Sequence, residues 1–166
     1  MKTIDRGPLA LMLLALVSVP ALASAAPEPA APPQIPYGAP ITLEQARGVA
    51  AAAEAEAKKR GVGVTIAIAD SSGALVYLQR MNGASIASAE TAPLKAKSAV
   101  EWQRPTSSWI AGVAAGNAAP IAYPNVLATN GGEMLVRDGH IVGGIGVGGS
   151  GPNEGPIAQA GVAAFK

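Results

Sequence analysis

The sequence contains no cysteine and a single histidine, His140. Without cysteine there are no disulfide bonds, thiolate nucleophiles or cysteine-ligated metals. With one histidine, a structural zinc site lacks its usual ligands. A Ser–His–acid hydrolase is also disfavoured, because its base would be the residue directly after the turn-forming Asp138-Gly139 and because no nucleophile-elbow motif is present.

Aromatic and charged residues are scarce, at 4% and 14% of the chain. The core must therefore consist of Val, Ile, Leu and Ala, and the length suits one domain. The formal net charge is +1 and no basic run occurs. We therefore expect neither nucleic acid nor an anionic membrane surface as a partner, since both require clustered lysine and arginine.

The first residues have the features of a secretory signal peptide. Lys2 and Arg6 precede an apolar run over residues 9–19, and Ala23-Ser24-Ala25 supplies small residues for cleavage. The run is shorter than the roughly 20 residues that span a bilayer, which disfavours a retained anchor. We expect a signal peptide over residues 1–25 and a periplasmic or secreted protein without stable membrane insertion. The mature chain would be neutral.

The predicted linker, residues 26–40, contains six prolines, and the folded domain is expected over residues 41–166. Thr42 and Gln45 match a capping box, and Asp138-Gly139 is a strong signal for a tight hairpin. Apolar periodicity and turn residues predict helices over residues 42–60, 93–102, 105–115 and 153–165, and strands over residues 64–69, 74–80, 126–128, 133–136 and 140–147. Hairpin-linked strands with packed helices indicate the α+β class.

Residues 143–151 are rich in glycine. A dinucleotide-binding motif would follow the first strand and open a helix, whereas these glycines close the last predicted strand. We expect Gly143 and Gly144 to permit close approach of a neighbouring element.

Several short motifs together resemble the GlcG/HbpS family and span residues 42–164. They are Asp70-Ser71-Ser72-Gly73-Ala74-Leu75-Val76, Arg80-Met81-Asn82-Gly83-Ala84, Lys95-Ala96-Lys97-Ser98-Ala99, Gly131-Gly132, Asp138-Gly139 and Gly144-Ile145-Gly146-Val147-Gly148-Gly149. The resemblance implies a profilin-like fold with a five-stranded antiparallel sheet flanked by helices. It also implies a homo-oligomer, with octamers among the family's assemblies, and a link to haem or corrinoids.

Two positions depart from the family pattern. Pro93 interrupts a stretch that is usually continuous helix, so we expect the helix carrying Lys95 to be shifted or shortened. The acidic residue that usually opens the last helix is represented by Glu154, one place displaced.

Lys95 is expected near the N-terminus of its helix, where a cation is unfavourable unless an anion lies nearby. It is a candidate for a ligand carboxylate or for an ion pair with Glu154. Arg80, at the end of a strand, is a candidate for a bidentate contact with a haem propionate, or for an edge-strand pair with Asp70 or Glu90. The other candidate ligand-binding residues, carried from the resemblance, are Gly132, Gly148, Gly149 and Glu154.

An imidazole-ligated haem iron has only His140 to use, although its place in a turn favours an ordinary exposed side chain. Tyr123 is the alternative oxygen ligand. Further oxygen or sulfur donors are Tyr77, Met81 and Met134, which are more typical of core or surface packing.

Three functions remain. The favoured one is an exported protein that binds haem or a related tetrapyrrole. The second is an enzyme or enzyme accessory acting on a small organic acid, with Lys95, Arg80 and Glu154 as its polar set. The third is an oligomeric sensor that binds another exported protein.

Overall fold

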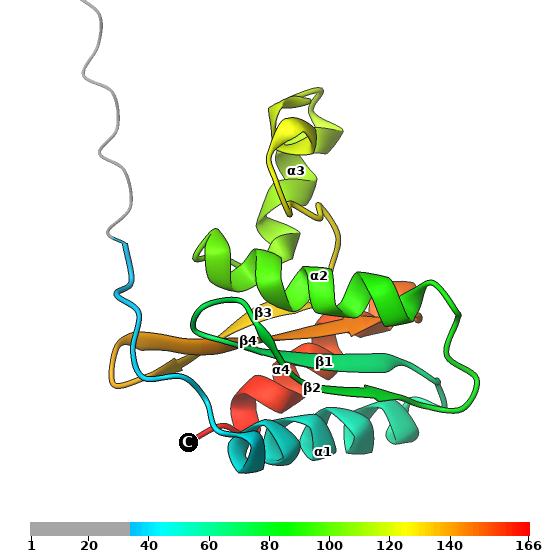
Figure 1. The fold of residues 1–166 in the computed structure, drawn as a ribbon. Helices are drawn as coiled ribbons and strands as arrows, with labels where there is room; N and C mark the ends of the chain where they lie inside the picture. The colour runs from blue at the N-terminus through cyan, green and yellow to red at the C-terminus, as the bar shows by residue number, and fades with distance from the viewer. Residues whose placement is uncertain (1–33) are drawn as a thin grey trace, which may run out of the picture. The chain divides into compact units, whose positions relative to one another are not determined.

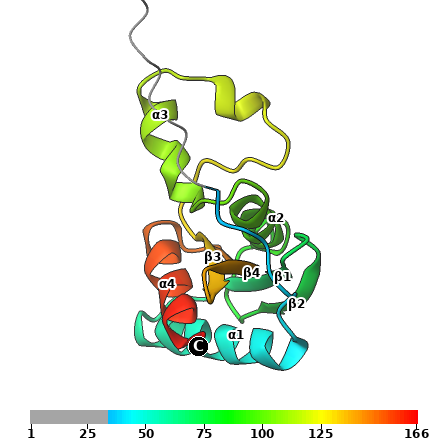
Figure 2. The same cartoon turned by 90° about the vertical axis from the view of Figure 1, so that its left-hand side faces the viewer.

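The structure, a computed structural model, describes residues 34–166, so the predicted signal peptide and the first part of the predicted linker lie outside the described residues. A sheet of four antiparallel strands, in the order β2-β1-β4-β3, has α2 on one face and α1 and α4 on the other (Figures 1 and 2). No helix in this part of the chain has the length and hydropathy to cross a membrane. The elements are α1 (Leu43–Lys59), β1 (Thr65–Asp70), β2 (Leu75–Arg80), α2 (Ser88–Glu101), η1 (Thr106–Trp109), α3 (Ile110–Ala114), η2 (Ala119–Ala122), β3 (Gly132–Arg137), β4 (His140–Gly148), η3 (Gly151–Asn153) and α4 (Glu154–Ala164).

Local signals define α1 and the two hairpins as predicted. The Thr42 hydroxyl accepts a hydrogen bond from the Gln45 backbone N–H at 3.3 Å, and the Gln45 side chain accepts one from the Thr42 N–H at 3.0 Å. Between β3 and β4, Asp138 and Gly139 both have positive φ, 51° and 75°, as a two-residue hairpin turn requires. The α+β assignment is confirmed.

The predicted strand over residues 126–128 is wrong, and the sheet within residues 34–166 has four strands, not five. The backbone of this segment bonds locally: the Val126 N–H donates to Tyr123 and the Thr129 N–H to Leu127. Asn125, which precedes it, has a positive φ of 58°. A short apolar run such as Val126-Leu127-Ala128 becomes a strand only where a ladder partner is available, and these residues pair with no strand.

The end of the predicted linker belongs to the folded unit. Pro36 and Gly38 exchange two backbone hydrogen bonds with Ile141, each 2.8 Å long, at the end of β4 that extends beyond β1. The Tyr37 hydroxyl donates to the Val100 carbonyl at 2.9 Å. The segment before α1 therefore covers one end of the sheet.

The expectation that Pro93 shifts or shortens its helix is wrong, because α2 runs through it from Ser88 to Glu101. A proline removes one backbone donor, but packing of the helix on β4 compensates. A Cβ on Gly144 would lie 2.7 Å from the Ala96 carbonyl oxygen, and one on Gly143 would meet the Ala69 carbonyl. The predicted close approach at both glycines is confirmed.

Residues 105–131, here called the arm, connect α2 to β3 and comprise η1, α3, η2 and the loop that follows. The arm projects away from the sheet on the side of α2 (Figures 1 and 2). Its base is held by Thr106, whose buried hydroxyl accepts a hydrogen bond from the Gly132 N–H at 3.0 Å.

Candidate functional site

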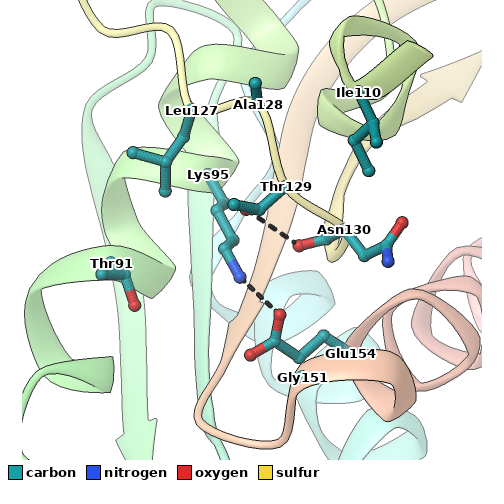
Figure 3. A pocket seen from close by; sticks show the side chains of 9 residues that line it. All are labelled: Thr91, Lys95, Ile110, Leu127, Ala128, Thr129, Asn130, Gly151 and Glu154. Atoms are coloured by element: carbon teal, nitrogen blue, oxygen red, sulfur yellow. Dashed lines mark hydrogen bonds and ion pairs between the residues drawn. The ribbon is translucent and has the colours of Figure 1, made fainter. Parts of the chain in front are cut away.

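The most unusual feature of the domain is a buried ion pair between α2 and the start of α4. Lys95 is 3% exposed and Glu154 is 7% exposed. The Lys95 ammonium lies 2.7 Å from Glu154 Oε2 (Figure 3) and 3.0 Å from the Val147 carbonyl oxygen. Of the alternatives for Lys95, the structure shows the pair with Glu154. Lys95 lies in the middle of α2 and not near its N-terminus, because the helix begins at Ser88.

Both carboxylate oxygens of Glu154 accept hydrogen bonds. Its Oε1 accepts hydrogen bonds from the backbone N–H groups of Gly149, at 2.8 Å, and Ser150, at 3.2 Å. As the first residue of α4, it also places a negative charge where the helix dipole favours one. The carboxylate thus joins the end of β4 to the start of α4 and fixes the position of the Lys95 ammonium.

An ammonium carries three N–H donors. Among the described residues, Lys95 donates to two acceptors, Glu154 and the Val147 carbonyl. One N–H is therefore available to a further acceptor.

A pocket of 390 Å³ opens beside this pair, between α2, the arm and η3 (Figure 3). Its volume is near the lower end of the range for small-molecule sites, roughly 300–1,000 Å³. The arm supplies apolar side chains to its wall, while threonine hydroxyls and an amide supply polar groups. The lining residues are Thr91, Lys95, Ile110, Leu127, Ala128, Thr129, Asn130, Gly151 and Glu154.

The glycines predicted to bind ligand lie around this pocket without lining it. A Cβ on Gly132 would lie 2.6 Å from the Lys95 carbonyl oxygen, and one on Gly148 would lie 2.8 Å from the Thr91 hydroxyl. Gly149 has a positive φ of 107° and donates its N–H to Glu154. The structure therefore gives these three residues packing and hydrogen-bonding roles that position α2 and Glu154.

Arg80 lies elsewhere. Its guanidinium donates to the Ala84 carbonyl at 3.0 Å, and the expected ion pairs with Asp70 or Glu90 do not form within the described residues. The Asp70 carboxylate instead accepts hydrogen bonds from Ser72 and Ala74 in the β1–β2 turn. Arg80 lines a separate hollow of 340 Å³ with Glu54 and Lys58 among its walls.

His140, the first residue of β4, lines a third hollow, of 610 Å³, at the β3–β4 hairpin. Its Nδ1 lies 2.8 Å from the Asp138 carbonyl oxygen. A carbonyl accepts but does not donate, so this hydrogen bond places a proton on Nδ1 and leaves Nε2 of the neutral ring as a lone-pair donor. The exposed imidazole lies at a place that the Lys95 pocket does not include.

Tyr123 belongs to an aromatic cluster at the base of the arm. Its ring stacks on Trp102 with centroids 5.1 Å apart, and Trp109 meets both rings edge-on. The Trp102 indole N–H donates to the Pro124 carbonyl at 3.1 Å, and the Arg104 guanidinium lies over the Trp109 ring. Tyr123 does not line the Lys95 pocket.

The remaining candidate iron donors pack against other side chains. Tyr77 and Met81 pack against the main core, and Met134 is half-buried on β3.

Sequence reasoning missed Thr91, Thr106 and the arm's contribution to the pocket. Thr91 precedes Lys95 by four residues, so helical spacing alone places both on one face of α2. The arm residues carry no comparable signal.

Burial raises the pKa of Glu133, a half-buried carboxyl on edge strand β3. No ion pair to Glu133 forms among residues 34–166. The group therefore meets the cost of desolvation without a compensating cation.

Comparisons with known proteins agree with this fold. The family model for "Haem degrading protein HbpS-like" matches residues 41–163. A double mutant of Streptomyces reticuli HbpS is 34% identical, with 86% of this chain and 99% of that chain covered and a TM-score of 0.71. A PduOC:heme complex is 29% identical, with coverage of 76% and 96% and a TM-score of 0.69. The Klebsiella pneumoniae protein ORFY is 24% identical, with coverage of 82% and 97% and a TM-score of 0.73, a likeness that shows the fold alone. No curated protein matches the sequence.

Proposed function

Because the chain belongs to the HbpS-like family, we propose that it is an exported protein that binds haem or a related tetrapyrrole in the pocket beside Lys95 and Glu154. The observation that carries the proposal is the pocket's composition: an apolar wall next to a buried ammonium with one N–H to spare. Haem itself combines a large apolar ring with carboxylates. The heme complex of PduOC supports the same ligand class.

The lining divides into two parts that match such a ligand. Ile110, Leu127 and Ala128 offer an apolar surface for one edge of the macrocycle. The available Lys95 N–H and the Thr91 hydroxyl offer donors for a carboxylate, whereas the Thr129 hydroxyl donates to the Asn130 carbonyl oxygen. Since the pocket is small, it encloses part of the macrocycle, and the remainder extends toward solvent.

The charge state of the pocket favours moderate affinity. Glu154 already balances the charge of the Lys95 ammonium, so the pocket is close to neutral. A bound carboxylate would therefore gain the energy of a hydrogen bond to Lys95 and not that of a full ion pair. Binding energy then comes mainly from apolar contact along the arm.

A second location for the macrocycle is the hairpin hollow, because His140 presents Nε2 as an iron ligand there. If His140 held the haem iron, its imidazole would tune the electronic properties of the metal. The chemistry itself would be that of the iron. The Lys95 pocket and His140 belong to different hollows, so the two locations make different predictions for variants.

The test is a haem titration of the mature protein followed by the Soret band. Ala128→Trp fills the Lys95 pocket, and Ala55→Trp, on the exposed face of α1, is its matched control. We expect saturable binding by wild type, Ala55→Trp and His140→Ala, and greatly weakened binding by Ala128→Trp.

Loss of binding in His140→Ala with retention in Ala128→Trp would move the ligand to the hairpin hollow. A wild-type protein without a saturable Soret shift would refute haem binding.

A further inference from the structure

One face of α2, continued by the C-cap residue of the helix, lies against the arm. It carries four side chains at intervals of four, three and four residues, which are Thr91, Lys95, Ser98 and Trp102. The first two line the pocket together with residues 127–130 of the arm (Figure 3). At the other end of this face, the Trp102 indole N–H donates to the Pro124 carbonyl at 3.1 Å. Ser98 lies between these contacts, so the arm covers it.

Ser98 is buried without a hydrogen-bond partner. The residue is 1% exposed, and its hydroxyl has no partner among residues 34–166. A serine inside a helix can donate to the carbonyl four residues earlier, but this one does not. Buried polar groups without a partner are uncommon in native proteins, so this hydroxyl requires an explanation.

The other unpaired groups lie around the same pocket. In the part of the chain that the structure describes, two more buried side-chain atoms lack a partner, the Trp109 indole nitrogen and the Ser150 hydroxyl oxygen. Trp109 precedes Ile110 and Ser150 precedes Gly151, and both of these neighbours line the pocket. Hydrogen-bond donors that lack an acceptor therefore gather around this pocket, which indicates a ligand rich in acceptors.

Residues 126–130, here called the strap, cover Ser98 without bonding to the helix below. Among the described residues, no hydrogen bond joins the strap to α2 or to the sheet. Its hydrogen bonds stay within the arm, for example from the Thr129 N–H to the Leu127 carbonyl at 2.8 Å. Leu127 and Ala128 are half-buried, so apolar contact holds the strap in place.

Hydrogen bonds hold the residues at the two ends of the strap. The Asn125 side chain donates to the Glu101 carboxylate at 2.8 Å, and the Gly131 carbonyl accepts from the Val147 N–H at 2.8 Å. Asn125 and Gly131 also have positive φ, 58° and 98°, so the chain turns at both ends. A segment that is fixed at its ends, and held between them by apolar contact alone, can lift while the rest of the domain stays folded.

We propose that the ligand site continues under the strap, which lifts so that Ser98 becomes a ligand-binding residue. This inference rests on the proposed function. Lys95 binds one carboxylate of the tetrapyrrole, and the Ser98 hydroxyl, about one helical turn along α2, donates to a second acceptor of the ligand. The hydroxyl that is unpaired in the free domain thus gains its partner when the ligand binds.

The test uses the absence of native cysteine, because a single introduced thiol then reports opening of the strap. Ser98→Cys places the thiol under the strap. Ser88→Cys is the matched control, because Ser88 also lies on α2 and is 1% exposed, but its hydroxyl bonds to that of Thr65 at 2.7 Å. We expect dithiobisnitrobenzoate to label Ser98→Cys at least about tenfold faster than Ser88→Cys, since local opening is more frequent than global unfolding.

A second pair of variants assigns the opening to the strap. Leu127→Ala, combined with Ser98→Cys, should raise the labelling rate roughly tenfold, because it removes apolar contact that keeps the strap closed. Ile121→Ala in the same background should leave the rate unchanged, because Ile121 is 70% exposed and lies outside the strap. Saturating haem should slow the labelling of Ser98→Cys. Circular dichroism verifies that each variant is folded.

Equal labelling rates for Ser98→Cys and Ser88→Cys would overturn the proposal, as would a rate for Ser98→Cys that saturating haem leaves unchanged. A wild-type protein without a Soret shift refutes the tetrapyrrole ligand and with it the role of Ser98 toward that ligand. Faster labelling of Ser98→Cys, raised further by Leu127→Ala, would in that case still support opening of the strap.

Discussion

Replacement of Lys95 by methionine leaves the Glu154 carboxylate buried without its cation. Removal of one partner from a buried ion pair costs about 3–5 kcal/mol. Glu154 keeps hydrogen bonds from Gly149 and Ser150, so we place Lys95→Met near the lower end of that range. Glu154→Gln leaves the more deeply buried ammonium without a counter-charge and belongs near the upper end. Domains have a total free energy of unfolding of roughly 5–15 kcal/mol, so either loss is severe.

The double variant Lys95→Met/Glu154→Gln removes both charges and retains the Gln oxygen as an acceptor for the Gly149 and Ser150 N–H groups. We therefore expect it to be more stable than the sum of the single effects implies, with a coupling energy of about 1.5–3 kcal/mol. Urea unfolding of the mature protein at neutral pH measures all three values. Additivity to within about 0.5 kcal/mol would refute the assignment of the pair as a coupled, buried interaction.

Other expected outcomes follow from the packing, the electrostatics and the leader. Gly146→Ala should destabilise the domain by about 1–3 kcal/mol, because its Cβ would collide with the Ala92 carbonyl oxygen and lie 2.6 Å from the Ala96 nitrogen, whereas Gly48→Ala, with nothing within 4 Å, should be neutral or stabilising; equal thermal shifts would contradict this. Burial raises the folded-state pKa of Glu133 above its ordinary value of 4.5, so its ionisation penalises the fold as pH rises through that folded pKa. Glu133→Gln should therefore stabilise the protein more at pH 7 than at pH 4, and a pH-independent difference in unfolding free energy would argue against it. We expect the protein recovered after expression in its host to begin at Ala26 by intact mass, and retention of residues 1–25 would contradict the predicted cleavage.

The parts of the fold that were predictable from sequence depend on contacts between neighbours in the chain. The capping box of Thr42 and Gln45 and the Asp138-Gly139 turn act within a few residues, so their signals are complete in the sequence. The path of α2 through Pro93 depends instead on packing against glycines of β4, which lie far along the chain. The loop over residues 126–128 has strand-like residues but no ladder partner, a condition that sequence alone does not show.

The candidate site, like the fold, was predictable from sequence only in part. Pairing of Lys95 with Glu154 was among the predicted alternatives, but the reason given, a place near the helix N-terminus, was wrong because α2 begins at Ser88. The separation of Arg80 and His140 into other hollows depends on where β2 and the β3–β4 hairpin end relative to α2. Those positions are set by the sheet order and have no local signature.

A crystal structure of the mature protein grown with haem would show whether the pocket beside Lys95 and Glu154 holds the tetrapyrrole. We expect a macrocycle edge against Leu127 and Ala128, with a carboxylate oxygen within hydrogen-bond distance of the Lys95 ammonium. A macrocycle bound at His140, with the Lys95 pocket unchanged and empty of ligand, would contradict it.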